Sequence, residues 1–284
     1  MMSTTLNVLS VIKINPLLWL VGGLAIVTGH FRELIILFSI VFIHELGHAF
    51  TAALFKWRLV KIELLPFGGV AEMDEYGNRP YHEELLVILA GPLQHVWMLA
   101  AASIGLNYGM GDPYLLQMII SINWMILLFN LLPILPLDGG RLLFLLVTLF
   151  VPFRKAKRRT LLLSCMFLLL FFSASISMFP FNLNLVVILF FLIFAHYIEW
   201  KHQSYVHLRF LLERFNLPQS FRRKRVISVP PNLRVDHVLA NFYKGYEHDI
   251  LVKASPPYMC KEKDLLSAYF KNSAVSCAIH DLFR

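Results

Sequence analysis

Three long stretches without any charged side chain dominate this sequence of 284 residues. Residues 85–111, 113–137 and 160–198 contain no Asp, Glu, Lys or Arg. A helix that crosses a bilayer needs about 20 mostly apolar residues, so the first two stretches can each supply one crossing and the third can supply two. Only 15% of the chain is charged and 57% is hydrophobic, whereas a soluble domain has about 25% charged residues. The sequence therefore predicts a polytopic α-helical membrane protein.

About six transmembrane helices are expected, and loop charges give their orientation. The third and fourth helices are expected to be separated by Asp112, and the first to extend backward from Pro16 through Val8–Ile14. Lys and Arg residues concentrate in the loops at 56–79 and 154–159, which places both termini in the cytosol by the positive-inside rule. The expected helices cover residues 10–29, 33–55, 83–107, 114–132 (continuing irregularly to 152), 160–178 and 183–200.

The positive charge is concentrated behind the last expected helix. Residues 1–200 hold 12 Lys and Arg against 11 Asp and Glu, whereas residues 201–284 hold 14 against 7. This contrast predicts a membrane-embedded domain over 1–200, an amphipathic helix and basic linker over 201–225, and a cytosolic domain over 226–284. Basic charge next to a membrane is typical of contact with anionic lipid, so we expect the lipid bilayer as a partner and no direct contact with nucleic acid.

The second expected helix carries an H-E-x-x-H motif from His44 to His48. Residues four apart on a helix lie on one face, so the two imidazoles can converge on one metal ion, and Glu45 lies beside them as a possible general base. Ionisable groups within a spanning helix are costly and are functional hypotheses by default. The alternative is a hydrogen-bonded histidine pair without a metal.

A third ligand is available in the run N-L-L-P-I-L-P-L-D-G-G-R, which extends from Asn130 to Arg141. Pro133 and Pro136 break the fourth helix, because proline removes backbone donors. Asp138 is a lone acid on irregular backbone, which at membrane depth is tolerated only beside protein or a water cavity. Catalytic zinc takes three protein ligands and leaves one position open, so Asp138 is the expected third ligand; the alternative is an Asp that caps a helix.

Together, H-E-L-G-H in a membrane helix and N-L-L-P-I-L-P-L-D-G-G-R about 90 residues later resemble the site-2 protease family of intramembrane zinc metalloproteases. The resemblance implies that His44, His48 and Asp138 bind zinc and that Glu45 activates water. It also implies that Asn130, Pro133 and Pro136 shape the active site and the approach of substrate.

Two further segments match patterns of that family. The tract from Leu64 to Met73 resembles its membrane-associated hairpin, in which Gly68 and Gly69 would contribute to substrate binding. An exposed edge segment there could pair with an extended substrate, although an ordinary loop with a Gly-Gly turn is equally compatible. Gly91 to His95 also fits a family pattern, and we expect His95 to be structural and not a ligand.

The C-terminal segment reads as a small α/β domain. Strands are expected at 226–229, 249–253 and 258–260, and helices at 235–242 and 263–271. This order resembles a single cystathionine-β-synthase (CBS) repeat, which implies ATP binding that involves Lys261 and Asp264, although Lys261 stands where Ser or Thr is usual. Because such repeats commonly pair, a single one implies a possible homo-oligomer.

The expected function is regulated zinc-dependent endoproteolysis of a membrane-associated protein near the cytosolic face. The six-helix layout and the CBS-like module resemble the stage IV sporulation group of the family, which implies a pro-sigma factor as substrate, membrane inhibitor or regulator proteins as partners, and a place in the mother-cell membrane around the forespore. The alternative is a metal transporter or metal-binding receptor that uses the same His and Asp residues, but no internal symmetry of the kind common in transporters is visible. A second alternative is an anchored soluble-type protease whose third ligand is Glu83 or Glu84.

Overall fold

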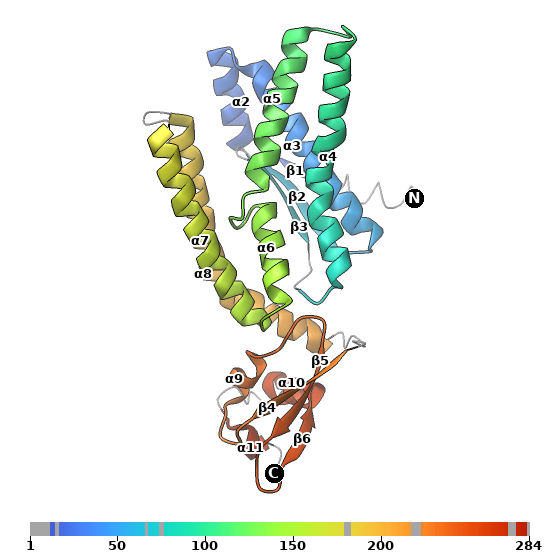
Figure 1. Cartoon of the computed structure of the whole chain (residues 1–284), viewed down its shortest axis with the longest axis vertical. Coiled ribbons are helices and arrows are strands. Elements are labelled where there is room, and N and C mark those ends of the chain that lie inside the picture. The colour runs from blue at the N-terminus through green and yellow to red at the C-terminus, as the bar shows by residue number, and fades with distance from the viewer. Residues whose placement is uncertain are drawn as a thin grey trace. The chain divides into compact units, whose positions relative to one another are not determined.

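A computed structural model of the chain describes residues 12–14, 17–65, 68–73, 77–178, 183–216, 223–271 and 277–282. These residues form mainly helices, with two three-stranded sheets (Figure 1). The chain divides into two compact units. The first holds α2 to α5, the sheet β1–β3, the start of α6 and residues 167–195 of α7 and α8. The second holds the remainder of α6 to α8 together with the C-terminal domain.

Five helices are long and apolar enough to cross a membrane among the residues that the structure describes. They coincide with five of the expected spans and make the chain a polytopic helical membrane protein. Helix α2 (Leu17–Thr28) lies in the remaining expected span and has only 12 residues, fewer than the about 20 of a full crossing. The five are α3 (Phe31–Leu54), α4 (Tyr81–Asn107), α5 (Pro113–Asn130), α7 (Phe153–Met178) and α8 (Leu183–Asn216).

The outer faces of these helices are apolar. Soluble proteins rarely expose large contiguous apolar patches, whereas a helix in lipid satisfies its backbone internally and can present apolar side chains to the hydrocarbon. Such exposed side chains occur on α4, α5, α7 and α8 and include Leu93, Val96, Trp97, Leu128, Leu169, Leu170, Phe190 and Phe194.

A small sheet in the first unit lies against the helix that carries the histidines. Strand β1 (Ile12–Ile14) pairs in parallel with β2 (Leu59–Leu65), which pairs antiparallel with β3 (Gly68–Met73). The expected backward extension of the first helix is therefore wrong for residues 12–14, which form a strand. Helix α3 contacts both β2 and β3. The predicted hairpin over 64–73 is present as two paired strands, while its residues 66 and 67 lie outside the described residues.

The fourth expected helix ends at Asn130, and the chain then turns irregularly before a new helix, α6 (Asp138–Thr148). Both predicted helix breakers, Pro133 and Pro136, lie in this turn, and the Leu135–Pro136 bond is cis. Ile134 is fully buried in a cluster with Leu168 of α7 and Leu192 of α8. The turn is thus held in place by packing against α7 and α8.

Helices α7 and α8 run side by side in opposite directions (Figure 1). In the second unit, Lys157 Nζ donates to Glu199 Oε2 over 2.6 Å, and Ser164 Oγ lies 3.2 Å from His196 Nδ1. Helix α8 has 34 residues and is about 51 Å long at 1.5 Å per residue, which exceeds the about 30 Å of hydrocarbon in a bilayer. The amphipathic helix expected at 201–215 is the continuation of this single helix.

The C-terminal domain has the predicted order of elements. Strand β4 pairs in parallel with β5, and β5 pairs antiparallel with β6. Its core includes the fully buried Val235, Leu239, Ile250 and Leu265. The elements are β4 (Lys224–Val229), α9 (Val235–Leu239), β5 (Glu247–Val252), β6 (Tyr258–Lys261), α10 (Glu262–Lys271) and α11 (Ile279–Leu282).

Candidate metal centre

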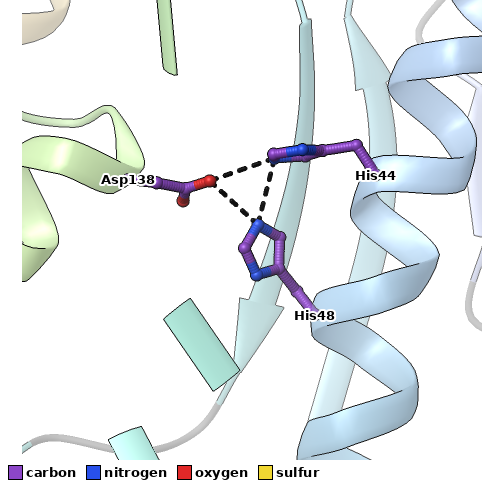
Figure 2. Close-up of side chains that lie close together, drawn as sticks. All are labelled: His44, His48 and Asp138. Atoms are coloured by element: carbon purple, nitrogen blue, oxygen red, sulfur yellow. Dashed lines mark hydrogen bonds and ion pairs between the residues drawn. The ribbon is translucent and has the colours of Figure 1, made fainter. Parts of the chain in front are cut away.

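The structure brings His44, His48 and Asp138 together inside the first unit (Figure 2). Successive turns of α3 present the two histidines on one face, and Asp138 reaches them from the first turn of α6. Asp138 Oδ2 lies 3.0 Å from His44 Nε2 and 3.1 Å from His48 Nε2, and the two Nε2 atoms are 3.1 Å apart. All three side chains are buried. Residues 90 positions apart in sequence thus form one compact triangle of nitrogen and oxygen atoms.

The hydrogen bond at the far side of His48 decides what this triangle can hold. His48 Nδ1 lies 2.7 Å from the carbonyl oxygen of Val87. A carbonyl only accepts, so Nδ1 carries the proton and Nε2 of the neutral ring points a lone pair into the triangle. Lone pairs of imidazole and carboxylate converging in a buried site repel one another unless a cation or a proton lies between them. The donor set therefore fits a divalent metal ion.

The dimensions of the triangle also suit zinc. Tetrahedral zinc has bonds of about 2.1 Å, which place its ligand atoms about 3.4 Å apart. The three separations of 3.0–3.1 Å need to widen by only about 0.3 Å to reach that geometry. Two imidazoles and one carboxylate leave a fourth position open, as in catalytic zinc sites.

Two glycines provide the space for the histidine pair. A Cβ atom at Gly91 of α4 would overlap the imidazole of His48 and lie 2.7 Å from His44 Cε1. A Cβ atom at Gly47 of α3 would lie 2.6 Å from the carbonyl oxygen of Ala90. The two helices therefore approach closely at the level of the imidazoles. The sequence pattern marked Gly91, but nothing in it indicated this role.

The Gly139–Gly140 pair positions Asp138 by allowing a close backbone approach. A Cβ atom at Gly139 would overlap the carbonyl oxygens of Leu131 and Leu132, and one at Gly140 would lie 2.5 Å from the backbone nitrogen of Leu135. The first turn of α6 therefore packs directly on the preceding irregular turn. This contact holds the carboxylate at a fixed distance from α3.

Glu45 is buried next to the histidines on α3. Its carboxylate follows His44 by one residue, so it belongs to the same turn of the helix. Glu83, considered above as a third ligand, instead accepts a hydrogen bond of 2.9 Å from Trp57 Nε1. Among the described residues, the cluster that could hold a metal contains Asp138 and neither Glu83 nor Glu84.

His95 contacts the triangle without belonging to it. Its Nε2 lies 3.0 Å from His44 Nδ1, on the side of that ring away from Asp138, and its Nδ1 hydrogen-bonds Asn123 Oδ1 of α5. His95 and Asn123 are completely buried. His95 thus lies between His44 and Asn123, and nothing in the sequence indicated the link to Asn123.

The remaining predicted residues occupy other positions. Asn130 is the last residue of α5 and is partly buried, as are Pro133 and Pro136 in the turn that leads to Asp138. Gly68 and Gly69 begin β3 and pair with Leu65 and Leu64 of β2. In the second unit, exposed Lys261 and Asp264 lie where β6 passes into α10.

Comparison with known proteins gives the family. The model of peptidase family M50 matches residues 33–111 and 107–173. Stage IV sporulation protein FB of Bacillus subtilis (strain 168) is 38% identical over 284 residues, which cover 99% of both chains. The chain belongs to peptidase family M50, the site-2 proteases.

Two further matches come from Methanocaldococcus jannaschii. The zinc metalloprotease MJ0392 of Methanocaldococcus jannaschii is 40% identical over 114 residues, or 38% of this chain and 32% of that protein. The solved structure of a site-2 protease from Methanocaldococcus jannaschii matches with a TM-score of 0.53 at 30% identity, covering 66% of this chain and 89% of the other. This M50 chain is an intramembrane zinc metalloprotease, and nothing in the comparisons supports the transporter alternative.

Proposed function

We propose that His44, His48 and Asp138 hold the zinc ion and that Glu45 is the general base of peptide hydrolysis. The observation that carries this assignment is the buried triangle of Nε2, Nε2 and Oδ2 atoms, 3.0–3.1 Å on each side. His48 donates its other ring proton to Val87 O, which leaves its Nε2 as an acceptor. An H-E-x-x-H helix with a carboxylate as third ligand is a known zinc donor set in metalloproteases.

The residues have distinct tasks in the proposed reaction. Bound zinc supplies Lewis acidity, which polarises the scissile carbonyl and lowers the pKa of water. The Glu45 carboxylate takes a proton from the attacking water and delivers it to the nitrogen of the leaving amine. The buried surroundings of Glu45 keep other water away from this proton transfer and strengthen its electrostatic interactions.

The substrate is proposed to bind as an added strand. Strand β3 lies at one edge of the sheet order β1-β2-β3, and an edge strand presents unpaired backbone groups that an extended peptide can use. The same sheet contacts α3, which carries the histidines. Strand β3 begins with Gly68 and Gly69, which would contribute to substrate binding. Asn130, Pro133 and Pro136 would shape the approach of substrate to Asp138.

We infer further that the substrate is a pro-sigma factor, cleaved near the cytosolic face during sporulation. Full-length similarity to stage IV sporulation protein FB supports this assignment, as does the resemblance drawn from the sequence. Both termini would lie in the cytosol, since Lys and Arg concentrate in the corresponding loops. The protease would lie in the mother-cell membrane around the forespore, and its partners would include membrane inhibitor or regulator proteins.

The segment 226–284 is proposed to be a CBS-like regulatory domain that binds ATP. Its order of strand, helix, strand, strand and helix supports this reading. Lys261 and Asp264 are exposed at the junction of β6 and α10, where a phosphate and a ribose could be bound. Pairing of two such domains would make the protease a homo-oligomer.

The catalytic assignment is tested by Glu45→Gln in the full-length protein. Zinc content should stay at that of the parent, while cleavage of a co-expressed pro-sigma factor should fall by about 10²-fold or more, because the general base is lost. Glu33→Gln is the matched control, since Glu33 lies exposed in the first turn of the same helix. Undiminished cleavage by Glu45→Gln would contradict the assignment.

The nucleotide assignment is tested by equilibrium binding of ATP to the full-length protein in detergent. Binding should occur at millimolar ATP and should weaken in Lys261→Ala and in Asp264→Ala. Lys253→Ala provides a control, since Lys253 is an exposed lysine of the same domain outside the β6–α10 junction. Absence of binding, or equal binding by all variants, would contradict the proposal.

A further inference from the structure

The two histidines of the metal centre are oriented by different means. His48 is held by a backbone carbonyl, that of Val87, at 2.7 Å. His44 is held by another side chain, His95, whose Nε2 lies 3.0 Å from His44 Nδ1. A backbone carbonyl can only accept, whereas a neutral imidazole nitrogen can accept or donate depending on its tautomer. The state of His44 therefore depends on what fixes the tautomer of His95.

The direction of donation in the hydrogen-bonded series His44–His95–Asn123 follows from the metal site. If His44 Nε2 is to bind zinc, its ring proton must reside on Nδ1, and Nδ1 must donate to His95 Nε2. His95 then carries its own proton on Nδ1 and needs an acceptor there. Asn123 Oδ1 occupies that position. With Asn123 Oδ1 as the final acceptor, each of these hydrogen bonds has one donor and one acceptor when His44 presents a lone pair to the metal.

The hydrogen bonds of His44, His95 and Asn123 are important because these side chains are buried. Asn123 and His95 are 0% exposed and His44 is 3% exposed, so water cannot substitute for a lost hydrogen bond at either end. The chain also links three helices, because His44 lies on α3, His95 on α4 and Asn123 on α5. The ring of His44 is tilted by 49° to that of His95, with the ring centres 5.1 Å apart, so the contact between the two rings is made through their nitrogens and not by stacking.

We propose that His95, held by Asn123, is a positioning residue that keeps His44 in the tautomer and orientation in which Nε2 binds the metal. This inference rests on the proposed function, since it requires His44 to be a ligand. Both ring nitrogens of His95 are used by His44 and Asn123, so His95 acts through His44 and is not itself a ligand. Outer partners of this kind contribute about 10–100-fold to metal affinity in zinc enzymes.

The test compares two replacements of His95 in the full-length protein. His95→Leu removes both nitrogens, whereas the amide of His95→Gln can accept from His44 Nδ1–H and donate to Asn123 Oδ1. Zinc affinity, measured by competition with a fluorescent chelator, should fall about 10–100-fold in His95→Leu and should return to within about threefold of the parent in His95→Gln, because the hydrogen bonds are restored. Replacing zinc with Co²⁺ provides a spectroscopic readout, since the visible bands of the ion should shift in His95→Leu and return in His95→Gln.

Further variants keep the inference falsifiable. Asn123→Leu, which leaves His95 in place but removes its acceptor, should weaken zinc binding by a smaller factor. His82→Leu is the matched control, because His82 is an exposed histidine on the same helix, and its zinc affinity should equal that of the parent. His44→Leu is measured alongside: unchanged zinc affinity there would overturn the ligand set itself. The positioning role alone would be overturned if His44→Leu loses zinc but His95→Leu binds zinc as tightly as the parent. It would also be overturned if His44→Leu loses zinc and His95→Leu and His95→Gln bind zinc equally weakly.

Discussion

Gly91 shows how a residue without a side chain can shape the reactive groups. A Cβ atom at Gly91 would overlap the imidazole of His48 and lie 2.7 Å from His44 Cε1, so both imidazoles of the proposed ligands lie close to this glycine. Retreat of helix α4 would break the close packing of Gly47 of α3 against the carbonyl of Ala90. Space at this contact is therefore a requirement of the metal centre and not only of helix packing.

We therefore expect Gly91→Ala to displace the imidazoles and to weaken zinc binding. The loss should be about 10–100-fold, comparable with other changes that misorient a ligand, and peptidase activity should fall with it. Gly105→Ala is the matched control on the same helix, because a Cβ atom there meets nothing closer than 3.4 Å. Zinc affinity measured by chelator competition would contradict this view if Gly91→Ala and Gly105→Ala both matched the parent.

The sequence indicated the residues of the His44–His48–Asp138 cluster, which are the proposed ligands, but not the groups that orient them. His44 and His48 follow from helical spacing, and Asp138 stands out because few charged residues occur near it. In contrast, His48 is oriented by a backbone carbonyl and His44 by a side chain 51 positions away. Neither partner has a sequence signature, because a carbonyl is present in every residue and the pairing of His95 with Asn123 exists only once α4 and α5 are packed.

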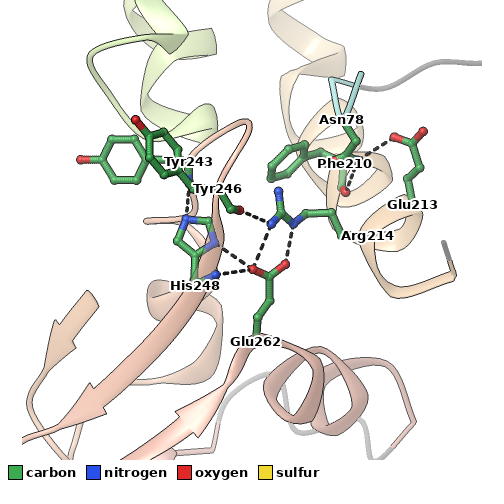
Figure 3. A network of polar contacts seen from close by, with 8 residues as sticks. All are labelled: Asn78, Phe210, Glu213, Arg214, Tyr243, Tyr246, His248 and Glu262. Carbon is green, nitrogen blue, oxygen red and sulfur yellow. Dashed lines mark hydrogen bonds and ion pairs between the residues drawn. The ribbon is translucent and has the colours of Figure 1, made fainter. Parts of the chain in front are cut away.

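At the scale of elements, the C-terminal end of α8 is fastened to the C-terminal domain by a buried ion pair (Figure 3). Arg214 Nε and Nη2 donate to the two carboxylate oxygens of Glu262 over 2.6 and 2.9 Å, and Nη2 also donates to the carbonyl of Tyr246. Glu262 additionally accepts from the backbone N–H and the Nδ1–H of His248. Helices α8 and α10 and strand β5 thus meet at one carboxylate.

Glu262→Gln should destabilise this junction strongly. Removing one partner of a buried ion pair leaves the other charge uncompensated and typically costs about 3–5 kcal/mol. Hydrogen–deuterium exchange of the β5 amides in the full-length protein should accelerate accordingly. Asp236→Asn removes an exposed ion pair with Arg234 and should change exchange little, since such pairs contribute about 0–1 kcal/mol. Equal exchange in the two variants would contradict the role given to Glu262.

Elements with strong patterns were predicted well, and short ones were not. The apolar runs predicted the positions of α3, α4, α5, α7 and α8, and the strands expected in the C-terminal segment lie close to their observed bounds. Residues 12–14 were assigned to a helix because they continue an apolar run, yet they form β1 by pairing with β2, about 50 positions away. A three-residue strand has too little local signal to compete with the helical run beside it.

At the scale of the whole molecule, the chain divides its charge and its chemistry between two units. The first unit contains the proposed zinc ligands and 16 of the 44 charged residues of the chain, whereas the shorter second unit contains the other 28. The second contains the Arg214–Glu262 pair and 20 of the 26 Lys and Arg residues of the chain. The scarcity of charge that excluded a soluble fold also made Glu45 and Asp138 conspicuous. In the second unit, charged and titratable groups make the stability depend on pH.

His248 is the residue through which acid should act on the second unit. Its Nδ1–H donates to Glu262, and its Nε2 accepts a hydrogen bond of 2.9 Å from the backbone N–H of Tyr243. Both contacts are satisfied only by the neutral ring. Burial lowers the pKa of His248 more than the hydrogen bond to Glu262 raises it, and the charges of Arg214 and Arg225 lower it further. Burial alone raises the pKa of Glu262, but the hydrogen bond from His248 and the charge of Arg214 outweigh it and lower that pKa.

Both shifts have the same sign for stability. A group whose pKa is lower in the folded than in the unfolded state binds fewer protons when folded, so its contribution is present at high pH and is lost as pH falls. Protonation of His248 should begin to cost stability below its ordinary pKa of 6.5, and Glu262 should add to the loss below 4.5. Protection of the β5 amides, corrected for the pH dependence of intrinsic exchange, should therefore decrease from pH 7.5 to pH 5.5. His248→Gln should flatten this decrease, whereas His237→Gln, on the exposed side of α9, should keep it; protection that is constant or rises on acidification would show that His248 is not the neutral partner of Glu262.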